Sequence, residues 1–103
     1  MINHTMLVAF AGPIPDADLD QFLGEIEDVL RKTGVVEQVS AQRHIPVPGE
    51  EEIPAMIATA VLSVGVTDRD ALGVLFTAPG AEEIIHRWQA RYPYRVAWVN
   101  HEV

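Results

Sequence analysis

One stretch of the sequence has a clear helical pattern, and it limits what the rest of the chain can form. Acidic residues crowd its first turn and Arg31 and Lys32 its last, as the helix dipole favours. Asp16 is expected to be the N-cap, and Gly34 supplies a C-terminal stop. The pattern predicts a helix over residues 17–32 whose apolar side chains share one face: Leu19, Phe22, Leu23, Ile26, Val29 and Leu30.

Four other segments have the composition of β-strands. Residues 2–11 form the first, and residues 35–47, rich in β-branched side chains with rough alternation, form the second. A turn of prolines, glycine and acids over residues 48–54 separates it from the third. That third strand, residues 55–66, is apolar at both parities, so we expect both of its faces to be covered. Residues 95–102 form the last strand.

An interrupted helix is predicted between the last two strands. Thr67 is expected to cap its first part, with Asp70 in a weak capping box. The segment "TAPG" at 77–80 interrupts it, and Pro79 can occupy the first turn of a new helix that runs to about Arg91. One face of this second part carries Ala81, Ile85, Trp88 and Tyr92.

The resulting order, βαββαβ, predicts an α+β fold of the ferredoxin-like type, with a four-stranded antiparallel sheet and two helices on one face. We expect residues 1–103 to be a single domain, because this is close to the commonest domain size. Two helices cannot cover the other face of the sheet, and strands 2–11 and 55–66 carry large apolar residues at both parities. Since burying each such side chain is worth roughly 1.5–3 kcal/mol, we predict a homodimer, a dimeric α/β barrel whose sheets pack face to face.

The net charge of the chain limits the classes of partner that it is expected to bind. Fifteen acidic against seven basic residues give a net charge of −8. Nucleic acid phosphates and anionic membrane surfaces would repel such a chain, whereas a hydrophobic small molecule suits it. The sequence has no cysteine, and its four histidines lack the spacing of a zinc site, so neither a metal nor another cofactor is predicted. Without a signal peptide pattern or a long apolar run, a cytoplasmic location is predicted.

His4 stands in the first strand among the large apolar residues Ile2, Met6, Leu7, Val8 and Phe10. If the strand alternates regularly, His4, Met6, Val8 and Phe10 share one face. A histidine in a cleft can exchange a proton with a ligand near neutral pH. The alternative is a structural histidine near the start of the strand, bonded to a backbone carbonyl.

The last strand supplies candidates for the neighbourhood of His4. Trp98 and Asn100 have one parity, so both could flank His4 if the first and last strands are neighbours. Asn100 would then orient the imidazole or bind a substrate carbonyl, and His101 takes that role if the register is shifted. The alternative makes Trp98 a core residue and the other two terminal polar residues. His86 is predicted to point into solvent, away from the apolar face of its helix.

The start of the chain, "HTMLVAF" at 4–10, is followed by an amphipathic helix, two strands and a helix broken by a short proline segment. This order resembles the dimeric α/β-barrel superfamily, and most of all its stress-responsive A/B-barrel branch, to which olivetolic acid cyclase belongs. The resemblance spans nearly the whole chain. "TAPG" at 77–80 stands where the proline segment belongs, and a polar pair, Asn100 and His101, ends the last strand. The resemblance implies a cleft between sheet and helices, with His4 lining it.

The departures from that family concern its chemistry. In the cyclase the broken helix carries a His-Pro-Ala-His segment whose second histidine is the acid/base. Here the residues are Ala78-Pro79-Gly80-Ala81, so that base is absent. Asn100 stands in place of the acid that pairs with it, and Leu75 lies near the place of a tyrosine. The resemblance therefore implies the shape of the cavity and not the catalytic dyad.

We predict a small cofactor-independent enzyme that acts on a hydrophobic, carbonyl-rich, polyketide-like molecule by cyclisation, isomerisation or elimination. His4 would transfer the proton, supported by Asn100 or His101, and orientation in a dry cavity would supply much of the rate. Three alternatives stay open: a non-catalytic ligand-binding or stress-response dimer, a cofactor-free monooxygenase of the antibiotic-biosynthesis type, and a regulatory dimerisation module. The residues predicted to shape the cavity are Met6, Val8, Phe10, Leu75, Trp88 and Trp98.

Overall fold

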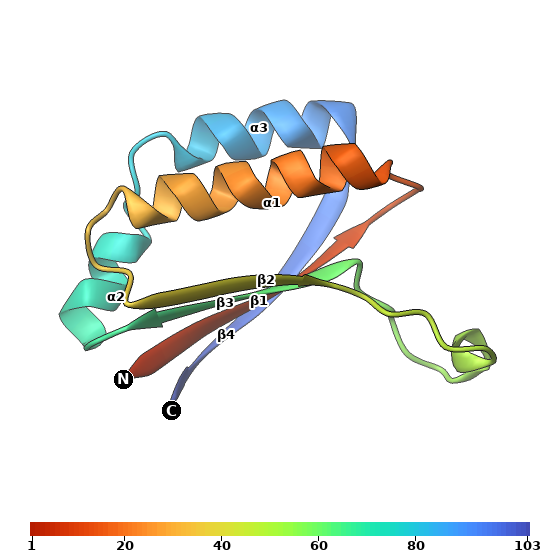
Figure 1. Ribbon diagram of the computed structural model, residues 1–103, viewed down its shortest axis with the longest axis horizontal. Helices are drawn as coiled ribbons and strands as arrows, with labels where there is room; N and C mark the ends of the chain where they lie inside the picture. Colours follow the sequence, from red (N-terminus) through yellow and green to blue (C-terminus); the bar gives the residue numbers. More distant parts are fainter.

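A computed structural model describes residues 1–103 as a sheet with helices on one side of it (Figure 1). In chain order the elements are β1 (Ile2–Phe10), α1 (Asp16–Arg31), β2 (Gln38–Arg43), a short 3-10 helix (Glu50–Glu52), β3 (Ala60–Val66), α2 (Arg69–Leu75), α3 (Ala81–Arg91) and β4 (Tyr94–Glu102). The four strands form one antiparallel sheet in the order β2-β3-β1-β4. The predicted ferredoxin-like fold is confirmed, with the interrupted helix present as α2 and α3.

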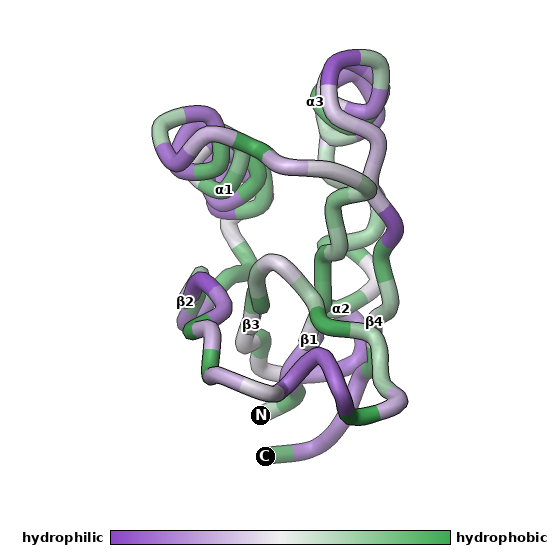
Figure 2. The backbone as a smooth tube through the Cα atoms, turned by 90° about the vertical axis from the view of Figure 1, so that its right-hand side faces the viewer, coloured by the Kyte–Doolittle hydropathy of each residue, from purple (hydrophilic) through white to green (hydrophobic).

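The helices lie over one face of the sheet and leave the other face bare. In Figure 2, α1 lies above the β2–β3 half and α3 rises on the side of β4. The core between the layers is built from the apolar stripe of α1, with Phe22 against Trp88 of α3, and from inward side chains of the sheet such as Val8 and Leu62. None of the helices has the combination of length and apolar character that crossing a bilayer requires.

Two predicted strands are longer than the observed ones. β2 covers only part of residues 35–47, and β3 begins at Ala60 rather than at residue 55. Pairing between them ends at Arg43 and Ala60, with one further backbone bond from His44 N–H to Thr59. The prolines at 46, 48 and 54 cannot donate to a ladder, so the chain leaves the sheet here and forms a projecting loop.

The predicted helix starts are wrong by one residue or more. Asp68, not Thr67, caps α2, because its Oδ1 accepts a hydrogen bond from the Ala71 N–H at 2.8 Å. Asp16 is the first residue of α1, and the N-cap position is taken by Pro15. The N-cap of α3 is Gly80, whose φ of 87° suits glycine, so the preceding proline lies outside that helix.

The bare face of the sheet is less apolar than the sequence indicates. Strand register places Leu7 beside Val61 and Ala97, but it places Thr5 beside Ser63. The prediction that the third strand is apolar on both faces holds only in part. On its outer face, which the helices do not cover, Ser63 and Gly65 interrupt the apolar residues. The apolar area that remains, called the open-face patch below, consists of Leu7, Val61, Ala97 and Val99.

Glu25 joins the two long helices. Its carboxylate accepts hydrogen bonds from Gln21 Nε2 at 2.9 Å and from the Trp88 indole N–H at 3.1 Å, and it also pairs with Arg87. The hydrogen bond from Gln21 lowers the pKa of Glu25 below its usual value, with further lowering from Trp88 and Arg87 against an opposing effect of desolvation.

Glu25→Gln should therefore destabilise the fold in a pH-dependent way. Because the pKa of Glu25 in the folded state lies below the unfolded value near 4.5, its stabilisation is present above that pH and is lost as the pH falls through the lowered pKa. We expect a loss of about 1 kcal/mol at neutral pH, which disappears in acid, measured by urea unfolding at both pH values. Glu82→Gln, at an exposed site on α3, is the control. An equal loss at both pH values would contradict the assignment.

Candidate functional site

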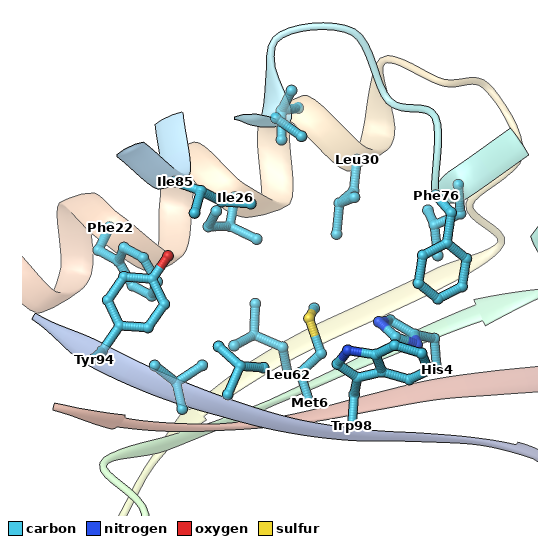
Figure 3. Close-up of a pocket in the computed structure, with 15 residues that line it drawn as sticks. His4, Met6, Phe22, Ile26, Leu30, Leu62, Phe76, Ile85, Tyr94 and Trp98 are labelled. Atoms are coloured by element: carbon cyan, nitrogen blue, oxygen red, sulfur yellow. The ribbon is translucent and has the colours of Figure 1, made fainter. Parts of the chain in front are cut away.

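A cavity of about 320 Å³ lies between the sheet and the helices (Figure 3). The sheet provides its floor through inward side chains of β1, β3 and β4, and α1 provides most of its roof. Residues around the break between α2 and α3 close one side of it. Apart from His4, every lining residue is apolar or aromatic: Met6, Val8, Phe22, Ile26, Val29, Leu30, Leu62, Leu75, Phe76, Ala81, Ile85, Tyr94, Val96 and Trp98.

His4 reaches the cavity because β1 alternates regularly. The side chains of His4, Met6 and Val8 all face the helices, as the period of two in a strand requires. The residue is only 5% exposed, so it is a nearly buried imidazole in an apolar surrounding. The predicted cavity-facing position of His4 is thus what the structure has.

Asn100 fixes the imidazole of His4. The two residues face each other in the antiparallel pairing of β1 and β4, and His4 Nδ1 lies 2.7 Å from Asn100 Oδ1. An amide oxygen only accepts hydrogen bonds, so Nδ1 carries the proton of the neutral ring. The lone pair then belongs to Nε2, which is the nitrogen available as a base. The backbone-bonded histidine considered as the alternative is not what the structure contains.

Two aromatic rings enclose His4 together. The ring centroid of Phe76 lies 5.0 Å from that of His4, and the centroid of Trp98 lies 5.3 Å from it. Phe76 and Trp98 are also in contact, at 5.2 Å. Figure 3 shows the three rings together at one end of the cavity, with Phe76 coming down from the helix side. Phe76 was absent from the predicted set, although it stands next to Leu75 at the break of the helix.

Four of the six residues predicted to shape the cavity line it, namely Met6, Val8, Leu75 and Trp98. Phe10 shares their face of β1 but packs beyond the cavity, with its ring 5.3 Å from Phe22 and 5.2 Å from Tyr94. Trp88 lies in the core behind Phe22 and donates its indole N–H to Glu25. The prediction is wrong for these two aromatics, because neighbouring core side chains separate them from the open space.

His101 lies on the wrong face for the role considered for it. The register of β1 and β4 is not shifted, so His101 lies opposite Asn3 and points to the bare face of the sheet. There its Nε2 lies 3.3 Å from Thr5 Oγ1. His86 is on the outside of α3 with a side chain that is 74% exposed, as predicted. Nowhere does the structure gather three or more histidine, aspartate or glutamate side chains that could hold a metal ion.

No protein-family model matches the sequence, and no curated protein matches it either. The fold is found in several solved structures. A dabb family protein with a ferredoxin-like fold from Mesorhizobium loti matches with a TM-score of 0.74 at 14% identity, over 99% of this chain and 95% of the other. The hydroxynitrile lyase from Passiflora edulis matches with a TM-score of 0.74 at 11% identity, over 99% and 92%.

SnoaB, a cofactor-independent oxygenase from Streptomyces nogalater, matches with a TM-score of 0.72 at 11% identity, over 99% of this chain and 91% of the other. Other solved structures that share the fold are described as dimeric. These likenesses confirm the predicted ferredoxin-like fold. They include a lyase and an oxygenase, so the fold serves more than one kind of enzyme.

Proposed function

We propose that the protein is a small enzyme that binds a hydrophobic carbonyl compound in the cavity and uses His4 as its base. The observation that carries this proposal is the orientation of one ring: Asn100 binds Nδ1, and Nε2 is left for a ligand in an apolar cavity. Cyclisation, isomerisation and elimination next to a carbonyl can all begin with the loss of a proton from the α carbon. A polyketide-like molecule offers several such protons.

The proton transfer needs no group beyond His4 and the substrate. Nε2 takes the α proton, and the electrons of the C–H bond move into the carbonyl to give an enolate. The imidazolium formed keeps its Nδ1–H bond to Asn100 and returns its other proton to carbon or to a leaving oxygen. The rings of Phe76 and Trp98 pack against the imidazole and restrict how a flat substrate can lie beside it.

A direct test uses an enolisable aromatic ketone, 1-tetralone, in D₂O. If Nε2 acts as a base in the cavity, the protein should accelerate the exchange of the α protons for deuterium well above the rate in buffer. Proton NMR follows that exchange without knowledge of the natural substrate. Binding of 1-tetralone without any acceleration would contradict the proposal.

Measurements on the same purified protein distinguish two other functions from this one. A purely ligand-binding protein is favoured by the lining of the cavity, since no titratable side chain other than His4 lies at that end. It predicts binding of the ketone with no exchange. An oxygenase, as in SnoaB, predicts uptake of dissolved oxygen with an aromatic substrate in the absence of any added cofactor.

The proposed working unit is a homodimer that packs its sheets together through the open-face patch. Leu7, at the centre of this patch, is 44% exposed in the single chain, and covering it would be favourable. Native mass spectrometry of the freshly purified protein should give twice the chain mass of 11.4 kDa and would reveal any co-purified ligand.

Leu7→Asp should convert that dimer to a monomer, because the variant would bury unpaired carboxylates in the interface at a cost of several kcal/mol. Native mass spectrometry measures the change. Val74→Asp is a matched control, since Val74 on α2 is also 44% exposed but lies away from the bare face of the sheet. If the Leu7 variant remains a dimer, the sheets do not pack through this patch.

A further inference from the structure

Tyr94 is a buried polar side chain that the proposed chemistry at His4 does not use. It begins β4, lines the cavity and is only 7% exposed. Figure 3 shows it at the end of the cavity opposite His4, with the hydroxyl projecting from the sheet toward the helix layer. Its ring is held by Phe10 and Phe22, whose centroids lie 5.2 and 5.1 Å away.

The hydroxyl of Tyr94 donates its proton to no protein group. Gln89 holds the backbone of this residue, donating from Nε2 to the carbonyl oxygen at 2.8 Å and accepting from the N–H at 3.0 Å. Neither bond uses the hydroxyl. The residue lines the cavity, where the hydroxyl proton can meet an acceptor on a ligand. Burial raises the pKa of Tyr94, and a hydrogen bond from the side chain of Gln89 opposes part of the rise, so the hydroxyl stays a hydrogen-bond donor at neutral pH.

The register of the sheet separates the two polar groups by the length of a strand. His4 faces Asn100, and Tyr94 faces Phe10, so six residue steps lie between the two positions. At ~3.3 Å per residue this is about 20 Å between the Cα atoms. The floor between them is apolar, made by Met6, Val8 and Val96. The cavity is therefore a long, largely apolar slot with His4 near one end and Tyr94 near the other.

We propose that Tyr94 is a second, specificity-determining anchor and that the cavity takes an elongated, planar, hydrophobic molecule with a hydroxyl at the His4 end and a hydroxyl or carbonyl at the Tyr94 end. One end binds His4 Nε2, and the other end binds the Tyr94 hydroxyl. A compact ligand with a single polar group reaches only one of them. This inference rests on the proposed function in that His4 is the first anchor.

The test uses two rigid fluorescent probes, trans-4,4′-dihydroxystilbene and trans-4-hydroxystilbene, which differ by one terminal hydroxyl. We expect the protein to bind the dihydroxy compound about tenfold more tightly, as one additional buried hydrogen bond allows. Fluorescence titration measures both affinities, and this comparison needs no variant. Equal affinity for the two probes would overturn the inference.

Tyr94→Phe should abolish the preference while leaving the affinity for the monohydroxy probe unchanged. The ring and its packing remain, so the variant should fold, and circular dichroism verifies that it does. Tyr92→Phe is the matched control, because the Tyr92 hydroxyl donates to Asp18 at 2.5 Å and does not line the cavity. A preference that survives in Tyr94→Phe would overturn the assignment of this residue.

Failure of this inference is separable from failure of the proposed function. If both probes bind equally and 1-tetralone still exchanges its α protons, Tyr94 is not an anchor, and the role of His4 is unaffected. If neither probe binds to the protein and no exchange occurs, both proposals are wrong. If the preference is present but exchange is absent, the cavity binds a two-ended ligand without the proposed chemistry.

Discussion

His4→Gln should reduce the protein-catalysed exchange of α protons in 1-tetralone by about 100-fold or more. Glutamine retains a polar side chain of similar reach that can still contact Asn100, but it has no basic nitrogen. A positioned general base contributes typically 10²–10⁴-fold to a rate, so its removal should return exchange nearly to the rate in buffer. Because Nδ1 is bound at 2.7 Å, we assign the whole effect to Nε2. Proton NMR in D₂O gives both rates.

His86→Gln is the matched control for this prediction. It makes the same substitution on the outside of α3, where the side chain touches nothing of the cavity. Its exchange rate should equal that of the unmodified protein. Full activity in the His4 variant would remove that residue from the mechanism, and loss of activity in the His86 variant would place the base elsewhere.

Phe22→Ala should cost about 3–5 kcal/mol of stability, a large part of the ~5–15 kcal/mol that holds a domain of this kind together. Phe22 is 2% exposed, and its ring contacts the rings of Phe10, Trp88 and Tyr94 at centroid distances of 5.3, 5.6 and 5.1 Å. The small core between α1 and the sheet cannot collapse around so large a void. Urea unfolding at neutral pH measures the loss.

Phe76→Ala is the control for the same deletion of a ring. Phe76 is 51% exposed at the end of the cavity, so its loss should cost much less than that of Phe22. The comparison separates burial from the mere removal of an aromatic side chain. Equal costs at the two positions would show that the ring cluster around Phe22 does not hold the core together.

Several parts of this structure follow from patterns that are local in the sequence. The stripe from Leu19 to Leu30 predicts α1 because residues three and four apart meet on one side of any helix, whatever lies around it. The alternation of β1 likewise places His4 with Met6 and Val8 on one face. The shared parity of Trp98 and Asn100 allowed both to flank His4 if the first and last strands are neighbours, and in the structure both contact it.

The predictions that are wrong depend on distances between elements. Phe10 lies on the cavity-facing side of β1, and Trp88 lies on the apolar side of its helix. Both nevertheless pack against the ring of Phe22 and do not line the cavity. Phe22 lies on α1, so the sequence around Phe10 and Trp88 does not show where the ring of Phe22 is placed. The β2–β3 loop has a local cause instead, because Pro46, Pro48 and Pro54 end the pairing beyond His44 and Thr59.

By itself, the sequence determined the approximate position of each helix and strand, the order of those elements and the parity of the first and last strands. These properties depend on backbone periodicity, which acts over a few residues. The tertiary structure alone decided the register that places Asn100 opposite His4 rather than His101, the contact of Phe76 with both rings, and the place of Tyr94 at the far end of the slot. Register and packing are set by how side chains far apart in the chain fill a common space, and a shift by one residue would have reversed the face of every side chain on β4.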